Sequence, residues 1–76
     1  MATAVILKRF HITPAADGWH LRTEGESDES SHRTKAKAIQ RARELAKEQH
    51  AGEIVVHSRD GSVEDQIIYS EDLRRH

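Results

Sequence analysis

Hydrophobic and polar residues alternate in two segments near the start of the chain, with a turn sequence between them. The segments run from Val5 to Thr13 and from Trp19 to Glu24, and Asp17-Gly18 supplies the positive φ that a tight reversal needs. This alternation predicts a β-hairpin in which Ile12 lies opposite Leu21. The core face of the predicted hairpin consists of Phe10, Ile12, Trp19 and Leu21.

A helical period follows these two segments. Small and apolar residues recur at every third or fourth position from Ala38 to Gln49, which predicts one helix with a narrow apolar stripe. Thr34 is the predicted N-cap, and Gly52 is the predicted C-terminal stop. Because the stripe is rich in alanine, the helix can lie close to a sheet.

A second hairpin is predicted after the helix. Its strands run from Glu53 to Ser58 and from Val63 to Tyr69, and Asp60-Gly61 forms the turn, which places Ser58 opposite Val63. Since the run from Ile54 to Val56 is apolar on both faces, its strand is predicted to lie in the interior of the sheet. The core face of this hairpin is expected to consist of Ile54, Val56, Val63, Ile67 and Tyr69.

The order of these elements, β-β-α-β-β, predicts an α+β domain with two layers. The expected sheet has four strands, is largely antiparallel and carries the helix on one of its faces. At 76 residues the chain has room for one hydrophobic core, so a single domain is expected over residues 1–76. Within it we expect an ordered core over about residues 5–70, a polar loop at 24–31 and a charged C-terminal tail at 70–76.

Composition excludes several kinds of chemistry. The chain has no Cys, so disulfides, thiolate metal ligands and cysteine nucleophiles are excluded. Its four Gly form neither a GxSxG elbow nor a phosphate-cradling loop. We therefore expect a protein that is not an enzyme, with no catalytic residue, no cofactor and no identifiable small-molecule substrate.

The apolar content also bears on location. The longest apolar run near the start, Ala4 to Leu7, is far shorter than the roughly 20 residues that a membrane span requires. Together with the lack of Cys, this predicts a cytoplasmic protein with no membrane partner.

Six histidines invite a metal-site interpretation. The most plausible ligands, all predicted on the outer sheet face, are His11, His20, His57 and Glu64. Because neither HxxxH nor HExxH spacing occurs, scattered surface histidines are the better interpretation, and no metal is expected. In that interpretation His57 lies opposite Glu64 as a cross-strand ion pair.

Charge is distributed in blocks, although the formal net charge is only −1. Residues 31–52 carry a net charge of +4, and the predicted helix begins with cations, which the helix dipole disfavours by ~0.3–1 kcal/mol each. A segment that tolerates this cost is a candidate for binding an anion such as nucleic-acid phosphate. The alternative is a solvated helix start, screened by the acidic loop before it. The candidate contacts are Arg33, Lys35, Lys37 and Arg41.

The sheet face that points away from the helix is predicted to stay uncovered. It would expose more apolar surface than a small monomer usually leaves bare, and domains of this size often rely on oligomerisation. We therefore predict that this face contacts a second copy of the chain, as a homodimer, or a protein partner. The candidate residues are Val5, Leu7, Val55 and Ile68. A homodimer through an edge strand is also open, and the alternative is that these are isolated exposed apolar residues.

Several segments together resemble a known family. They are Asp17 to Leu21, Thr34 to Ile39 with Ala42 to Ala46, Glu53 to His57, and Arg59 to Gly61. In order and spacing they are similar to the small bacterial family known as domain of unknown function 2188, over roughly Phe10 to Tyr69. The resemblance implies a stand-alone bacterial or phage-encoded domain in the cytoplasm, and it carries over no activity, cofactor or catalytic residue.

The predicted function is that of a small interaction module that engages itself or a protein partner through the open sheet face. The alternative is binding of the nucleic-acid phosphate backbone by the basic start of the helix. A further alternative is a phage-encoded inhibitor of a host system.

Overall fold

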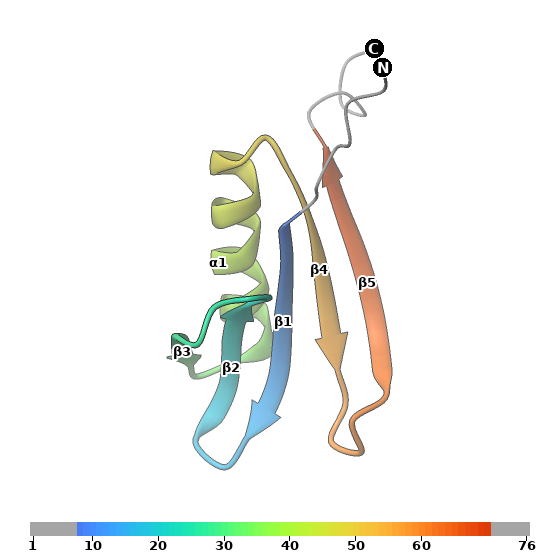
Figure 1. Cartoon of the computed structure of the whole chain (residues 1–76). Helices are drawn as coiled ribbons and strands as arrows, with labels where there is room; N and C mark the ends of the chain where they lie inside the picture. Colours follow the sequence, from blue (N-terminus) through green and yellow to red (C-terminus); the bar gives the residue numbers. More distant parts are fainter. Residues whose placement is uncertain (1–7, 71–76) are drawn as a thin grey trace.

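One helix lies against one face of a five-stranded sheet (Figure 1). The computed structural model describes residues 8–70. Within this range no helix is both long and apolar enough to cross a membrane. The elements are β1 (Lys8–Ala15), β2 (Gly18–Thr23), β3 (Glu29–His32), α1 (Lys35–Glu48), β4 (Ala51–His57) and β5 (Val63–Ser70).

The strand order is β3-β2-β1-β4-β5, and the pairing is mixed. All neighbouring strands are antiparallel except β1 and β4, which run parallel. The predicted α+β architecture is therefore confirmed, whereas the expectation of four strands in a largely antiparallel sheet needs correction. The prediction that β4 is an interior strand is also confirmed, since it lies between β1 and β5.

The core lies between α1 and the central strands. The stripe of α1 that faces the sheet is made of Ala38, Ala42 and Ala46, each fully buried. Such short side chains allow the helix axis to approach the sheet closely, where strand residues fill the space. The buried strand residues in this cluster are Phe10, Ile12, Leu21, Ile54 and Val56, with Trp19, Ile39, Leu45, Ile67 and Tyr69 packed against it.

The first hairpin has the predicted register. Ile12 lies opposite Leu21 and Pro14 opposite Trp19, and the two-residue turn at Ala16 and Asp17 is followed by Gly18 with a φ of 136°. The polar segment after this hairpin was expected to be only a loop, and that expectation was wrong. Residues 29–32 form β3, which pairs with β2 through backbone hydrogen bonds although all four of its side chains are polar.

The helix begins as predicted but ends earlier. The Lys37 amide donates to Thr34 Oγ1 at 3.1 Å, which confirms Thr34 as the N-cap. The helix ends at Glu48, and the residue with positive φ is His50, at 66°. Gly52, the predicted stop, is instead a buried residue of β4, where a Cβ would lie 2.8 Å from Cβ of Ala46. Its role is therefore to permit the close approach of helix and sheet.

A β-bulge changes the register of the second hairpin. Val56 pairs with Asp65 while His57 pairs with Val63, so Glu64 is an extra residue on β5. The predicted pairing of Ser58 with Val63 was therefore wrong. The bulge moves Val63 from the expected core face to the uncovered face, beside His57, where it is 53% exposed.

Candidate binding site on the uncovered sheet face

Polar side chains form rows across the sheet face that α1 leaves uncovered. The register places Glu29 beside Arg22, Arg22 beside His11, His11 beside Val55 and Val55 beside Gln66. These residues come from all five strands. Their side chains lie on one face because each strand contributes from the outward half of its alternation.

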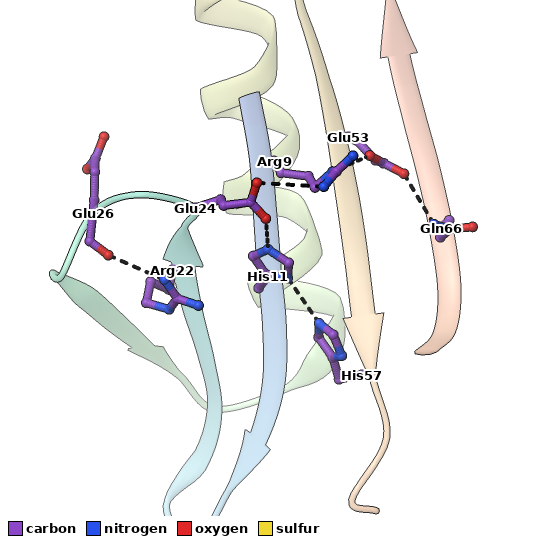
Figure 2. A network of polar contacts seen from close by, with 8 residues as sticks. All are labelled: Arg9, His11, Arg22, Glu24, Glu26, Glu53, His57 and Gln66. Atoms are coloured by element: carbon purple, nitrogen blue, oxygen red, sulfur yellow. Dashed lines mark hydrogen bonds and ion pairs between the residues drawn. The ribbon is translucent and has the colours of Figure 1, made fainter. Parts of the chain in front are cut away.

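A chain of charged and polar contacts connects β1 and β4 through Glu24, the residue that follows β2 (Figure 2). Arg9 Nε donates to Glu53 at 2.8 Å, and Arg9 Nη1 lies 3.6 Å from Glu24. Glu24 in turn lies 2.8 Å from His11 Nε2, and His11 Nδ1 lies 3.0 Å from His57 Nε2. The two imidazole rings are stacked, with centroids 5.2 Å apart.

This network also explains the burial of Val55. Val55 was expected to contribute exposed apolar surface to a partner, but it is only 4% exposed. Its neighbours across the sheet are His11 and Gln66, and Glu53 and His57 flank it along β4. Long polar side chains on every side therefore cover it. Of the other candidate face residues, Val5 and Leu7 lie outside the described residues, and Ile68 is 59% exposed.

The contacts in the middle of the network stabilise the charges of Arg9 and Glu24. The hydrogen bond from His11 lowers the pKa of Glu24, and Arg9 adds an attractive charge. The hydrogen bond to Glu53 raises the pKa of Arg9, with a further contribution from the carboxylate of Glu24. Glu24 and Arg9 are therefore ionised throughout the physiological range, and His11 faces a permanent negative charge.

The carboxylate of Glu24 fixes the proton positions on the histidine pair. Since Glu24 accepts from His11 Nε2–H, a neutral His11 has its lone pair on Nδ1, which accepts from His57 Nε2–H. A protonated His11 instead donates from Nδ1, and the proton of a neutral His57 then lies on Nδ1. The pair can therefore take up one proton without losing the hydrogen bond between the rings.

A hollow of about 490 Å³ opens beside the histidine pair. Its wall comes from β1 between His11 and Pro14, from single residues of β2 and β3, and from the end of β4 with the loop that follows it. Two arginines, Arg22 and Arg59, belong to its wall, together with one carboxylate, Glu29. The other wall residues that matter for its chemistry are His11, His57 and Thr13.

The basic start of the helix is not a free cluster of four cations. Lys35 pairs with Glu64 at 2.7 Å and lies 5.7 Å from the ring centroid of Trp19. Arg41 pairs with Glu44 at 3.1 Å. Arg33 and Lys37 are exposed and form no ion pair with the residues between 8 and 70. Two of the four candidate anion contacts are therefore already paired.

Of the four residues considered as metal ligands, only His11 and His57 are brought together. His20 lies between Asp17 and Glu29, at 3.0 and 3.2 Å. The expected ion pair of His57 with Glu64 was wrong, because the bulge places Val63 opposite His57 and Glu64 pairs with Lys35. Among the described residues no group of three His, Cys, Asp or Glu side chains could hold a metal ion.

Sequence reasoning missed the hollow and its two arginines. The alternation in β1 and β2 already placed His11 and Arg22 on the outward face, so part of the signal was present. The parallel pairing of β1 with β4 was the missing information, since it alone brings His57 and Arg59 to the same place.

The fold and its uncovered face define a small α+β domain whose candidate site is a polar surface crossing five strands. The chain belongs to the family described as "Uncharacterized protein conserved in bacteria (DUF2188)", whose model matches residues 10–69. This match confirms the resemblance noted from the sequence. The chain is 30% identical to the uncharacterized protein YycD of Bacillus subtilis (strain 168) over 63 residues, which cover 80% of this chain and 96% of that protein. No solved structure matches the chain.

Proposed function

We propose that the protein is a small, non-enzymatic bacterial interaction module that acts in the cytoplasm and binds a second copy of itself along β5. The observation that carries this proposal is the exposure of Val63 and Ile68. They are the exposed large hydrophobic residues of the described chain, and both belong to β5, at the border of the uncovered face. Apolar side chains gathered on one strand favour a protein contact over a purely solvated surface.

The backbone of β5 supports the same proposal. This strand forms one edge of the sheet, and no strand within residues 8–70 pairs with its outer side. The unpaired N–H and C=O groups of an edge strand are a template for adding another strand. The opposite edge is β3, which has four residues against the eight of β5 and only polar side chains. Strand addition is therefore favoured at β5.

The charge pattern of β5 favours self-pairing in the antiparallel sense. Two copies centred on Gln66 would place Ile68 of each strand opposite Glu64 of the other and Ile67 opposite Asp65. Glu64 and Asp65 of one copy would then lie opposite isoleucines and not opposite Glu64 and Asp65 of the other copy. Parallel pairing in register would align like charges, which is unfavourable.

Nucleic-acid binding by the helix start has less support. Lys35 and Arg41 already have carboxylate partners, and the hydroxyl of Thr34 accepts from a helix amide. Binding of a phosphate backbone there would have to displace these contacts.

The test is the mass of the protein in solution, measured by sedimentation equilibrium. We expect a mass that approaches twice 8.6 kDa as the protein concentration rises, and a monomer for Ile68→Arg. Gln40→Arg, which adds the same charge on the exposed side of α1, is the matched control and should associate like the wild type. A monomeric wild type at millimolar concentration would refute self-association, and so would equal association of the two variants.

A further inference from the structure

We propose that the hollow beside the histidine pair binds the phosphate group of a small molecule, held by Arg22 and Arg59 with His57. This site is separate from the contact proposed along β5, and it requires no second copy of the chain. Its volume of about 490 Å³ lies within the range of small-molecule pockets, which is about 300–1,000 Å³.

Neither arginine forms an ion pair with the described residues, although Arg22 is attracted at longer range by the carboxylate of Glu24. Arg22 Nη1 donates only to the backbone carbonyl of Glu26, at 3.5 Å, and Arg59 forms no ion pair between residues 8 and 70. Guanidinium groups match a phosphate well because their fixed N–H donors can bind two oxygens at once. The two guanidinium groups carry five N–H donors each, and one of those on Arg22 is already used by the Glu26 carbonyl.

The wall also contains one carboxylate, that of Glu29, which repels an anion. Glu29 lies directly opposite Arg22 in the register, but the contact it makes is with His20, at 3.2 Å. With both imidazoles of the wall neutral, the wall still carries a net charge of +1, from two arginines and one glutamate. Each proton taken up by the histidine pair adds to this charge.

The loop that carries Arg59 is held by a compact set of hydrogen bonds. Oδ1 of Asp60 accepts from Ser58 Oγ at 2.7 Å, from the Ser62 amide at 3.0 Å and from Ser62 Oγ at 2.7 Å. These hydrogen bonds lower the pKa of Asp60 to about 2, and the bond from the Ser62 side chain makes the largest contribution. The loop is therefore ordered before a ligand arrives, which reduces the entropy cost of placing Arg59.

His57 links the hollow to the polar network of Arg9, His11 and Glu24. Its Nε2 is used by His11, whereas Nδ1 makes no hydrogen bond with the described residues. An anion at Nδ1 favours the arrangement in which this atom carries a proton, and the pair then takes one proton from solvent. The charged groups that face the pair are Arg9, Arg22 and Glu24, with Glu53 beyond Arg9. Of these, Glu24 directly stabilises the extra positive charge.

The test is a titration of the full chain with inorganic phosphate, followed by amide chemical shifts at low salt. We expect saturable changes at Arg22, His57 and Arg59. Arg59→Gln and Arg22→Gln should each weaken binding about tenfold or more, as loss of a charge-assisted donor pair implies. Arg43→Gln, on the exposed side of α1, removes the same charge elsewhere and should leave the affinity within about twofold, since only screened long-range charge is lost.

One further comparison sharpens the assignment. Adenosine monophosphate that binds more tightly than inorganic phosphate would identify a phosphate ester as the ligand, and equal affinity would identify the free anion. Chemical shifts that change linearly up to about 20 mM phosphate would mean an affinity far weaker than the millimolar affinity of a minimal site. That result would overturn the proposal. Equal affinity of the arginine variants and the wild type would also overturn it.

Discussion

Gly52 offers the sharpest test of how the helix packs on the sheet. A Cβ at this position would lie 2.8 Å from Cβ of Ala46 and 3.0 Å from Cε2 of Phe10. Ordinary carbon contacts are about 3.5–4.0 Å, so Gly52→Ala forces α1 away from β4 by up to roughly an ångström and Phe10 to shift as well. The backbone itself permits the change, because φ of Gly52 is not in the positive range.

The expected magnitude follows from two opposing effects. Overpacking a core costs about 1–3 kcal/mol. Replacing glycine restricts the unfolded chain and returns about 0.4–1 kcal/mol. The net loss for Gly52→Ala is therefore about 1–2 kcal/mol, a large part of the ~3–5 kcal/mol that a core of this size usually supplies.

The assay is urea unfolding followed by the fluorescence of Trp19, which packs against the core. With a slope of about 1 kcal/mol/M, the midpoint should fall by about 1–2 M at a fixed protein concentration. Ala46→Gly removes the methyl group that clashes with a Cβ at position 52. In that background the loss of unfolding free energy caused by Gly52→Ala should therefore shrink by about 1 kcal/mol. An unchanged cost in the Ala46→Gly background, or a higher midpoint for Gly52→Ala alone, would refute the close approach of α1 to β4.

Two other predictions concern a helix cap and a turn. Thr34→Ala removes the acceptor of the Lys37 amide and should lower the unfolding free energy by about 1 kcal/mol. Thr34→Ser keeps a hydroxyl acceptor and should therefore retain most of the stability of the wild type. Equal losses for the two variants in urea unfolding would contradict the cap. The pKa of Asp60 is lowered from 3.8 to about 2 by its bonds to Ser62 and Ser58, so its contribution to stability is complete above pH 3.8 and is lost as pH falls through about 2. The thermal midpoint of the wild type should therefore approach that of Asp60→Asn only in strong acid, and a carboxyl titration centred near 3.8 would argue against these hydrogen bonds.

Much of the fold is encoded in short-range patterns. The turn at Asp17-Gly18 and the alternation around it were enough to predict that Ile12 lies opposite Leu21. Thr34 followed by a three-to-four-residue period located the start and the buried stripe of α1. The apolar run from Ile54 to Val56 placed β4 inside the sheet. Each of these signals depends on residues that are close together in sequence.

Features that depend on distant neighbours were not predictable in the same way. Residues 29–32 form β3 through backbone bonds to β2, and their polar side chains give no alternation to detect. Gly52 was predicted to end the helix, but the residue with positive φ after α1 is His50. A glycine near a helix end can either adopt a positive φ or permit close packing, and only the position of Ala46 shows that Gly52 does the latter.

The candidate site shows the same limit. The bulge at Glu64 reverses the face of Val63, and no turn rule fixes where such an extra residue falls. The contact of His11 with His57 requires β1 and β4 to be neighbours, which follows from the path of the chain through α1. Sequence reasoning could therefore place polar residues on the uncovered face but could not show which of them meet.

Amide hydrogen exchange along β5, followed at low and high protein concentration, tests most directly whether two copies meet at this strand. Amides between Gln66 and Tyr69 that point away from β4 should gain protection as the concentration rises, while exposed amides of β3 keep the same rates. Exchange along β5 that is independent of concentration, or protection that rises only at β3, would contradict the account.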